Sequence, residues 1–255
     1  MPFNVGAARA QFVEQIRKAP RSPTPSDPVS YLDSPVPVLG LRVPTLRTIL
    51  ATFAKAHRNL TASEVNSLAA ALWSGEVLEE KALGIMLLDR FAKILDGASW
   101  ALADRWVDEA TGWALSDALA SGPIAKMVRR DRSRLSEVPR WTRSTNIWRR
   151  RASTYAMHDL VFAGELDQPF KILEKLLRDD EFWVQRAVGT WLRECWKRDR
   201  RRTEAFLRDH VQGLPPVTIT VATERAPKAL RLDLRRKARA AATEEKPGRS
   251  RNERS

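Results

Sequence analysis

Two side chains in the middle of the chain have the types and the spacing of a small reactive site. Trp113 and Asp117 are four residues apart, so on an α-helix the indole and the carboxylate project from the same face. The surrounding sequence is rich in arginine, and nearby positive charge favours an ionised carboxylate. The spacing is equally compatible with an indole that packs in the core and a carboxylate that only pairs with a neighbouring arginine.

The charge of the chain predicts a polyanionic partner. Lys and Arg number 44 against 31 Asp and Glu, which gives a net charge of +13. Arginine forks suit phosphates because they donate in pairs. The first basic cluster consists of Arg129, Arg130, Arg132, Arg134, Arg140, Arg143, Arg149, Arg150 and Arg151, and the second of Lys197, Arg198, Arg200, Arg201 and Arg202. Nucleic acid is the first choice of partner, and solvated faces without any partner are the other interpretation.

Several classes of protein are excluded by composition. The chain has a single cysteine, Cys195, so it contains neither an internal disulfide framework nor a cysteine-rich zinc site. Its three histidines lack metal-ligand spacing, and we expect no metal and no cofactor. There is no run of roughly 20 apolar residues and no N-terminal signal segment. These features predict a cytoplasmic protein without a membrane partner.

The elements that position these side chains are predicted to be helices. From residue 45 to about 210 the apolar periodicity is close to 3.6, and no segment alternates with period two. The predicted helices span 6–18, 45–56, 62–73, 77–94, 99–110, 112–129, 135–142, 146–163, 167–178, 181–198 and 202–210. Residues 20–44 contain seven of the fifteen prolines and are expected to form an extended or turn-rich crossing.

An internal repeat of 35 residues connects these helices. Leu78, Trp113, Trp148 and Trp183 recur at this interval, and Arg151-Ala152 overlays Arg186-Ala187. Such a period, with two helices in each unit, is typical of an α-solenoid. The second helix of each pair would then line one curved face, and the basic clusters would align along one concave groove. We expect a repeat domain over residues 1–212, a basic segment with a short helix near 223–240 within 213–242, and a disordered tail over 243–255.

Four segments together resemble the AlkD-type DNA alkylation repair enzymes, which are HEAT-like repeat DNA glycosylases. Residues 31–47 (Tyr-Leu-Asp-Ser-Pro-Val-Pro-Val-Leu-Gly-Leu-Arg-Val-Pro-Thr-Leu-Arg) are similar to a family segment in which a tyrosine precedes Leu-Gly and then Pro-x-x-Arg. Residues 112–117 resemble the family's Trp-x-x-x-Asp motif, and residues 146–152 its Asn-Ile-Trp-x-x-Arg-Ala motif. Residues 181–194 resemble the last motif, which ends in Leu-Arg-Glu. The resemblance covers about residues 25–210 in the same order, and it implies an all-α, right-handed α-solenoid of HEAT-like repeats.

The resemblance also implies roles for individual residues. Asp117 would be the catalytic carboxylate, and Trp113 would pack against the deoxyribose of the damaged nucleotide. Tyr31 would lie near the same site, and Arg151 and Arg193 would hold the flanking backbone phosphates. The same motifs make further positions candidates for DNA contact: Trp148, Arg186, Thr190 and Trp191.

The sequence departs from the family's pattern at one site position. Thr190 stands where the family often has a second tryptophan, directly after the glycine of the last motif. Trp191 is one residue further on, which is about 100° around an ideal helix. Gly112 and Ala114 also replace bulkier or acidic neighbours of Trp113. These changes bear on substrate range and on activity.

One carboxylate is sufficient for the chemistry that the resemblance implies. An N3- or N7-alkylated purine already carries a positive charge, so it leaves without a general acid, unlike an ordinary glycoside. The remaining oxocarbenium-like sugar can be stabilised by a fixed carboxylate, with aromatic faces adding about 0.5–2 kcal/mol each. The expected enzyme is a monomeric, monofunctional glycosylase that acts on duplex DNA, without flipping the base into a pocket and without a lyase step.

Two other functions remain open at this level. The first is a noncatalytic DNA-binding solenoid that keeps the basic groove, which the threonine at position 190 favours. The second is a repeat scaffold for an acidic protein partner, because solenoids commonly serve as binding surfaces.

Overall fold

The fold was analysed in a computed structural model, which describes residues 3–22 and 27–244. Every regular element in these residues is a helix, as predicted, and none is a strand. The residues separate into two compact units, 1–159 and 160–255, with the division inside α11 (His158–Phe162). This division differs from the boundary predicted near residue 212.

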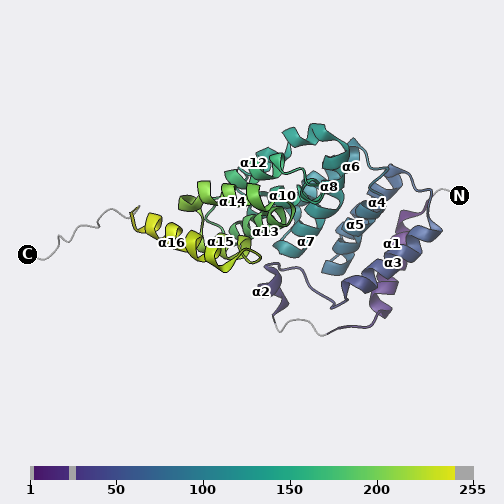
Figure 1. The fold of residues 1–255 in the computed structure, drawn as a ribbon. Helices are drawn as coiled ribbons and strands as arrows, with labels where there is room; N and C mark the ends of the chain where they lie inside the picture. The colour runs from purple at the N-terminus through teal and green to yellow at the C-terminus, as the bar shows by residue number, and fades with distance from the viewer. Residues whose placement is uncertain (1–2, 23–26, 245–255) are drawn as a thin grey trace, which may run out of the picture. The chain divides into compact units, whose positions relative to one another are not determined.

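Unit 1 is a stack of helix pairs. Its first helices are α1 (Val5–Lys18), α4 (Ala62–Trp73) and α6 (Gly97–Glu109), and α4 packs against both of the others. The second helices are α3 (Val43–Ala56), α5 (Leu78–Arg90), α7 (Gly112–Leu119) and α10 (Ile147–Tyr155), and each packs against the next (Figure 1). First helices thus stack on first helices and second on second, as a helical repeat requires. The right-handed sense of the solenoid stays a prediction.

The 35-residue repeat falls at one structural position. Leu78 is the first residue of α5, whereas Trp113 and Trp148 are the second residues of α7 and α10. In unit 2, Trp183 is the second residue of α13 (Phe182–Arg198). The repeat therefore marks the first turn of α5, α7, α10 and α13.

The predicted helix over 112–129 is interrupted. After α7 come a π-helical turn (Ala120–Ile124), α8 (Ala125–Arg130), a 3-10 turn (Arg132–Ser136) and α9 (Val138–Trp141). Gly122 and Pro123 lie inside the π-turn, and Gly122 leaves helical geometry with ψ −107°. Proline removes a backbone donor and cannot continue an α-helix, so the run breaks there.

In the described part of the crossing, residues 20–22 and 27–44, α2 (Pro28–Leu32) precedes the start of α3 at Val43. Asp27 caps it by accepting from the Ser30 backbone N–H at 3.0 Å, and Pro28 occupies its first position. α2 packs against α7, so this segment returns to the centre of unit 1.

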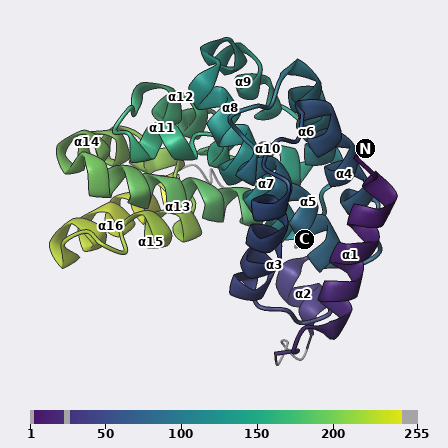
Figure 2. The ribbon, with the colours of Figure 1, turned by 90° about the vertical axis from the view of Figure 1, so that its right-hand side faces the viewer.

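Unit 2 contains α12 (Asp167–Lys175), α13, α14 (Arg200–Asp209), a 3-10 turn (Val211–Gly213), α15 (Pro216–Ala222) and α16 (Lys228–Glu244). Helices α14, α13 and α15 lie side by side (Figure 2). The backbones of α13 and α15 lie so close at Gly189 that a Cβ there would lie 2.9 Å from the Thr218 carbonyl oxygen. The short helix predicted near 223–240 corresponds to α16, which begins after a turn over 223–227, whereas α15 was not predicted. Residues 245–255 of the predicted tail lie outside the described residues.

Seven of the nine tryptophans are core residues: Trp73, Trp100, Trp106, Trp141, Trp148, Trp191 and Trp196. Some of these buried indoles find a hydrogen-bond acceptor, as in the bond of 2.6 Å that Trp73 Nε1 donates to the carboxylate of Glu109. Only Trp113 and Trp183 keep a substantial exposed face.

Candidate active site

The carboxylate of Asp117 is held by an arginine from the neighbouring second helix. Arg151 on α10 donates from Nε to Asp117 Oδ1 and from Nη2 to Oδ2, each at 2.7 Å. Arg151 Nη2 also donates to the hydroxyl of Tyr155 at 3.0 Å. The side chain of Asp117 is 17% exposed and that of Arg151 only 5%. Asp117 is therefore fixed by a bidentate ion pair and keeps limited access to solvent.

The ionisation of this pair is set by two opposing effects. Burial raises the pKa of the Asp117 carboxyl, whereas the hydrogen bonds from Arg151, its charge and a hydrogen bond from Tyr155 lower it. Burial disfavours the Arg151 guanidinium, but the Asp117 carboxylate outweighs this, and the pKa of Arg151 is raised. Burial is the largest of these effects, so the pKa of Asp117 is raised overall. The ionised carboxylate is favoured by the two bonds that its oxygens accept from a guanidinium that keeps its proton.

In this structure Arg151 binds protein groups, whereas the resemblance implied that it binds a backbone phosphate. It is 4% exposed, and its Nε and Nη2 donate to Asp117 and Tyr155. Arg151 is thus engaged inside the protein, and a contact of its guanidinium with a backbone phosphate stays a prediction. The pairing of Asp117 with an arginine, which the spacing left open, is the arrangement found, and it orients the carboxylate.

An aromatic pair lies one turn before Asp117. The indole Nε1 of Trp113 donates to the backbone oxygen of Tyr31 at 2.8 Å. The two rings meet edge to face, with centroids 5.4 Å apart and an interplanar angle of 85°. Tyr31 is 56% exposed. Trp113 is thus locked in orientation without being buried in the core, and the predicted proximity of Tyr31 to Trp113 is confirmed.

The segment that carries Tyr31, which we call the strap (residues 28–41), is fastened to the first turns of α5 and α7. At α7, Gly112 has φ +77°, and a Cβ there would lie 2.3 Å from the Leu32 carbonyl oxygen. Beside it, the hydroxyls of Ser34 and Thr111 are 2.9 Å apart. Only glycine allows this backbone conformation together with this approach.

At α5, the strap is held by a buried carboxylate that the sequence analysis did not identify. Glu79 is 2% exposed, and it accepts from the backbone N–H groups of Leu39, Gly40 and Leu41 at 3.0, 2.8 and 3.0 Å. Three charge-assisted bonds satisfy a carboxylate that would be costly to bury alone. Glu79 therefore fixes the C-terminal end of the strap, and its acceptor role had no signal in the local sequence.

Two tryptophans proposed for DNA contact are core residues, which corrects those assignments. Trp148 is 8% exposed and Trp191 is 4% exposed. Trp148 contributes its backbone oxygen, which accepts from Ser116 Oγ at 3.2 Å, so it packs α10 onto α7. Trp191 does not replace the missing tryptophan of the family's pattern, as the 100° offset predicted.

The remaining candidates lie on α13 in unit 2. Arg186 is exposed and Thr190 is partly exposed. Arg193 is engaged, because its Nη1 donates to Glu224 Oε2 at 2.5 Å and its Nε lies 3.5 Å from Glu194 Oε1. Of these two arginine candidates, Arg186 offers an exposed guanidinium, whereas Arg193 is already bound to carboxylates.

The first basic cluster is only partly available to a ligand. Arg149 is held by Asp104 and Asp108, at 2.9 and 2.6 Å. Arg130 donates to the carbonyl oxygens of Ala92 and Leu95, and Arg134 lies 2.7 Å from Glu137. Many of these arginines thus hold the repeat together, although sequence proximity had assigned them to one surface.

In the described residues, no group of three or more His, Cys, Asp or Glu side chains is arranged to hold a metal ion. A search of the same residues finds no helix of the length and apolar character needed to span a membrane.

The sequence was compared with known protein families. Residues 26–226 match the family described as "DNA alkylation repair enzyme". No curated protein matches the sequence.

Solved structures of low sequence identity share the fold. The structure of a predicted DNA alkylation repair enzyme from Enterococcus faecalis has a TM-score of 0.70 at 16% identity, covering 82% of this chain and 99% of that one. AlkD2 from Streptococcus mutans has a TM-score of 0.64 at 13% identity, covering 86% and 98%. Another chain from Streptococcus mutans, smu.31, has a TM-score of 0.55 at 15% identity, covering 71% and 96%. At these identities the likeness shows the fold, whereas the sequence match over most of the chain shows that this protein belongs to the DNA alkylation repair enzyme family.

Proposed function

We propose that this protein is a DNA glycosylase that hydrolyses the N-glycosidic bond of cationic N3- or N7-alkylated purines in duplex DNA. The observation that carries the proposal is the Asp117 carboxylate, which is oriented by two bonds of 2.7 Å from Arg151 and lies one turn after a partly exposed indole. The family to which the chain belongs supplies the substrate class, alkylated DNA.

The chemistry follows from the charge of the substrate. The alkylated base leaves with the electrons of the glycosidic bond and is neutralised by doing so, and therefore no general acid is needed. Positive charge then develops on the sugar, where a preorganised carboxylate stabilises it most effectively because no reorganisation is required. Trp113 and Tyr31 offer aromatic surface to the same cationic sugar. Water adds to C1′ of the sugar and releases one proton to solvent, which completes the hydrolysis.

Arg151 has two effects on this carboxylate. It fixes the direction of both oxygens and keeps Asp117 ionised in a site where burial alone would favour the protonated form. Arg151 also partly neutralises the carboxylate, so the developing charge on the sugar must compete with a buried ion pair. Because a cationic base leaves without a general acid, the proposal predicts that cationic lesions are cut and that neutral ones such as uracil are not.

The remaining features of the proposal come from the resemblance of the motifs. The enzyme would act as a monomer on duplex DNA in the cytoplasm, without a cofactor and without a lyase step. The damaged base would stay outside a pocket, and bulky adducts would thereby be accepted.

The test is base release from methylated duplex DNA by wild type and by Asp117→Asn. The substitution keeps the size of the side chain and removes its charge, so we expect a loss on the order of 10²–10³ in the single-turnover rate. Asp108→Asn is the matched control, because it removes a carboxylate that also pairs with an arginine, Arg149, but is 55% exposed. Equal release of 7-methylguanine by wild type and Asp117→Asn would exclude the catalytic assignment.

A noncatalytic DNA-binding protein is the second candidate. It is favoured by one observation: α13 presents Thr190 where the family often has an indole, and Trp191 is 4% exposed. This candidate predicts salt-sensitive duplex binding with no base released from any alkylated substrate.

A further inference from the structure

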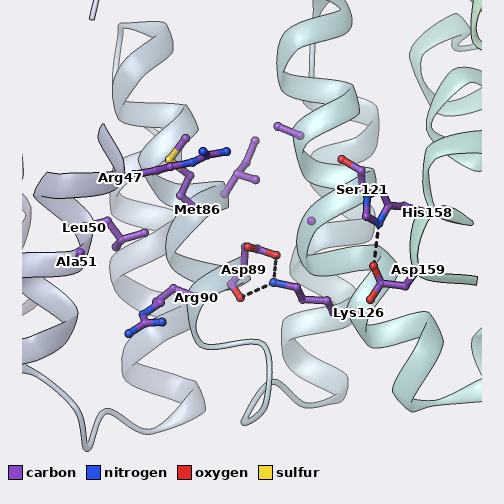
Figure 3. A pocket seen from close by; sticks show the side chains of 13 residues that line it. Arg47, Leu50, Ala51, Met86, Asp89, Arg90, Ser121, Lys126, His158 and Asp159 are labelled. Carbon is purple, nitrogen blue, oxygen red and sulfur yellow. Dashed lines mark hydrogen bonds and ion pairs between the residues drawn. The ribbon is translucent and has the colours of Figure 1, made fainter. Parts of the chain in front are cut away.

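A cavity of about 670 Å³ lies in unit 1, separate from the Asp117–Arg151 pair (Figure 3). Its walls come from α3, α5, the π-turn after α7, the start of α8 and the start of α11. The floor is apolar, with Leu50, Ile85 and Met86, and charged side chains surround it. An apolar recess with a few charged groups at its edge is the usual form of a ligand site.

The broken helix after Asp117 makes room for this cavity. Gly122 faces Asp89, and a Cβ at position 122 would lie 3.2 Å from Asp89 Oδ1, tighter than ordinary contact. Ala118 and Ser121 line the cavity, and Ser121 Oγ donates to the Asp117 backbone oxygen at 2.6 Å. The cavity and the candidate catalytic carboxylate are therefore adjacent along one helix.

Most of the charges around the cavity are paired. Lys126 Nζ lies 2.7 Å from Asp89 Oδ1, and His158 Nδ1 lies 2.8 Å from Asp159 Oδ1. Arg47 from α3 and Arg90 at the end of α5 are exposed, and no acceptor for either is found among the described residues (Figure 3). Among the Lys, Arg, Asp and Glu side chains that line the cavity, three are cations and two are carboxylates, so cations are in excess.

We propose that Arg47 and Arg90 bind phosphate of the DNA backbone at this cavity, beside the lesion site. This rests on the proposed function, because a strand whose damaged nucleotide lies at Asp117 would continue along the same helix. Each guanidinium can hold one phosphate by charge-assisted hydrogen bonds. The two groups come from adjacent helices and lie apart in Figure 3, so they would take separate phosphates of one strand. Arg47 ends the Pro-x-x-Arg motif, for which the catalytic site provides no role.

The test measures binding of unmodified duplex over a range of salt concentrations, independently of base release. Arg47→Ala and Arg90→Ala should each weaken binding on the order of tenfold, and the double variant should reduce the slope of log K against log salt by about 1 or more. Arg17→Ala is the control, because Arg17 is also exposed but lies in the last turn of α1, outside the cavity. The single-turnover rate of base release should be unchanged in Arg17→Ala, because Arg17 lies outside both the cavity and the Asp117 site.

A double variant with the slope of Arg17→Ala would overturn the inference. If that variant also released base normally, the proposed glycosylase would still stand, so the two failures are distinguishable. A parallel measurement follows the ³¹P linewidth of inorganic phosphate. Broadening that is lost in the double variant, together with an unchanged duplex slope, would mean that the cavity takes free phosphate and not DNA, which also contradicts the inference.

Discussion

A carboxylate in a poorly solvated place is useful for catalysis only if its charge is kept there. In this protein Asp117 is kept ionised by a single arginine that is itself buried, and Tyr155 completes the group from one turn further along α10. The sequence separation of four between Arg151 and Tyr155 places both on one helix face. Tyr155 therefore belongs to the site, although the sequence analysis did not assign it a role.

Removal of the Tyr155 hydroxyl should change the pH dependence of base release. The pKa of Asp117 is raised by burial and lowered by Arg151 and Tyr155, so Tyr155→Phe removes a lowering effect and raises this pKa further. Activity requires the carboxylate and is lost as pH falls through its pKa. We expect the acid limb of kcat/KM to move to higher pH in Tyr155→Phe, with the rate at pH 8 little changed.

The control for this profile is Tyr31→Phe, because Tyr31 offers Trp113 its backbone oxygen, which the substitution retains. An acid limb at the same pH in wild type and Tyr155→Phe would show that Asp117 does not govern it.

The single thiol should be unreactive while the protein is folded. Cys195 is 0% exposed, and burial raises its pKa to about 12. The thiolate is the reactive form, so a thiol reagent at pH 8 should label native protein very slowly and label one equivalent after unfolding. Rapid labelling of native protein would show that α13 opens readily.

At the scale of elements, the strap depends on a glycine that no other residue can replace. Gly112 combines φ +77° with a Cβ position 2.3 Å from the Leu32 carbonyl oxygen. Gly112→Ala should therefore cost about 1–3 kcal/mol of unfolding free energy and should displace the strap, which weakens the contact of Tyr31 with Trp113. Thermal unfolding and tryptophan fluorescence measure the two effects.

Gly164→Ala is the control that separates the cost of the positive φ from the cost of the steric clash with the strap. Gly164 has φ +79°, but a Cβ there would meet no atom within 4 Å. Its substitution costs only the conformational part. If the two variants lose equal stability, the close approach of the strap to α7 does not exist in solution.

The helices themselves could be predicted well because their signals are local. The predicted helix over 62–73 has the bounds found for α4, and its capping box between Thr61 and Glu64 is present. The break after Leu119 was missed, although Pro123 is a signal for it, because apolar periodicity continues through the π-turn. The start of α16 was misplaced by a few residues, since a polar amphipathic segment gives little periodic contrast.

The site could be predicted only in part, because burial depends on distant contacts. The spacing of Trp113 and Asp117 placed these two side chains on one helix face, but it did not identify Arg151 as the partner of Asp117. Glu79 was missed because its partners are about 40 residues away, at Leu39 to Leu41. Trp148 was assigned to DNA because a motif shows which residues matter to a family, but not whether they touch the ligand or hold the core.

At the scale of the whole molecule, the number of basic side chains overstates how many can contact DNA. The chain has 44 Lys and Arg, yet Arg149 and Arg134 are held by protein carboxylates and Arg130 by backbone oxygens. Each of these arginines contributes to the long-range field that attracts DNA. They cannot form a phosphate contact without giving up an internal partner.

Salt dependence of duplex binding distinguishes the two kinds of charge. Each phosphate contacted contributes about −0.9 to the slope of log K against log salt, so a chain that used all of its net charge would give a slope of about −12. Because many arginines are engaged inside the protein, we expect a much shallower slope, on the order of −5. Methylated and unmodified duplexes should give parallel lines, since phosphate contacts do not depend on the base. The vertical offset between the lines measures recognition of the lesion. A slope near zero would mean that DNA is not the polyanion for which this basic surface is built.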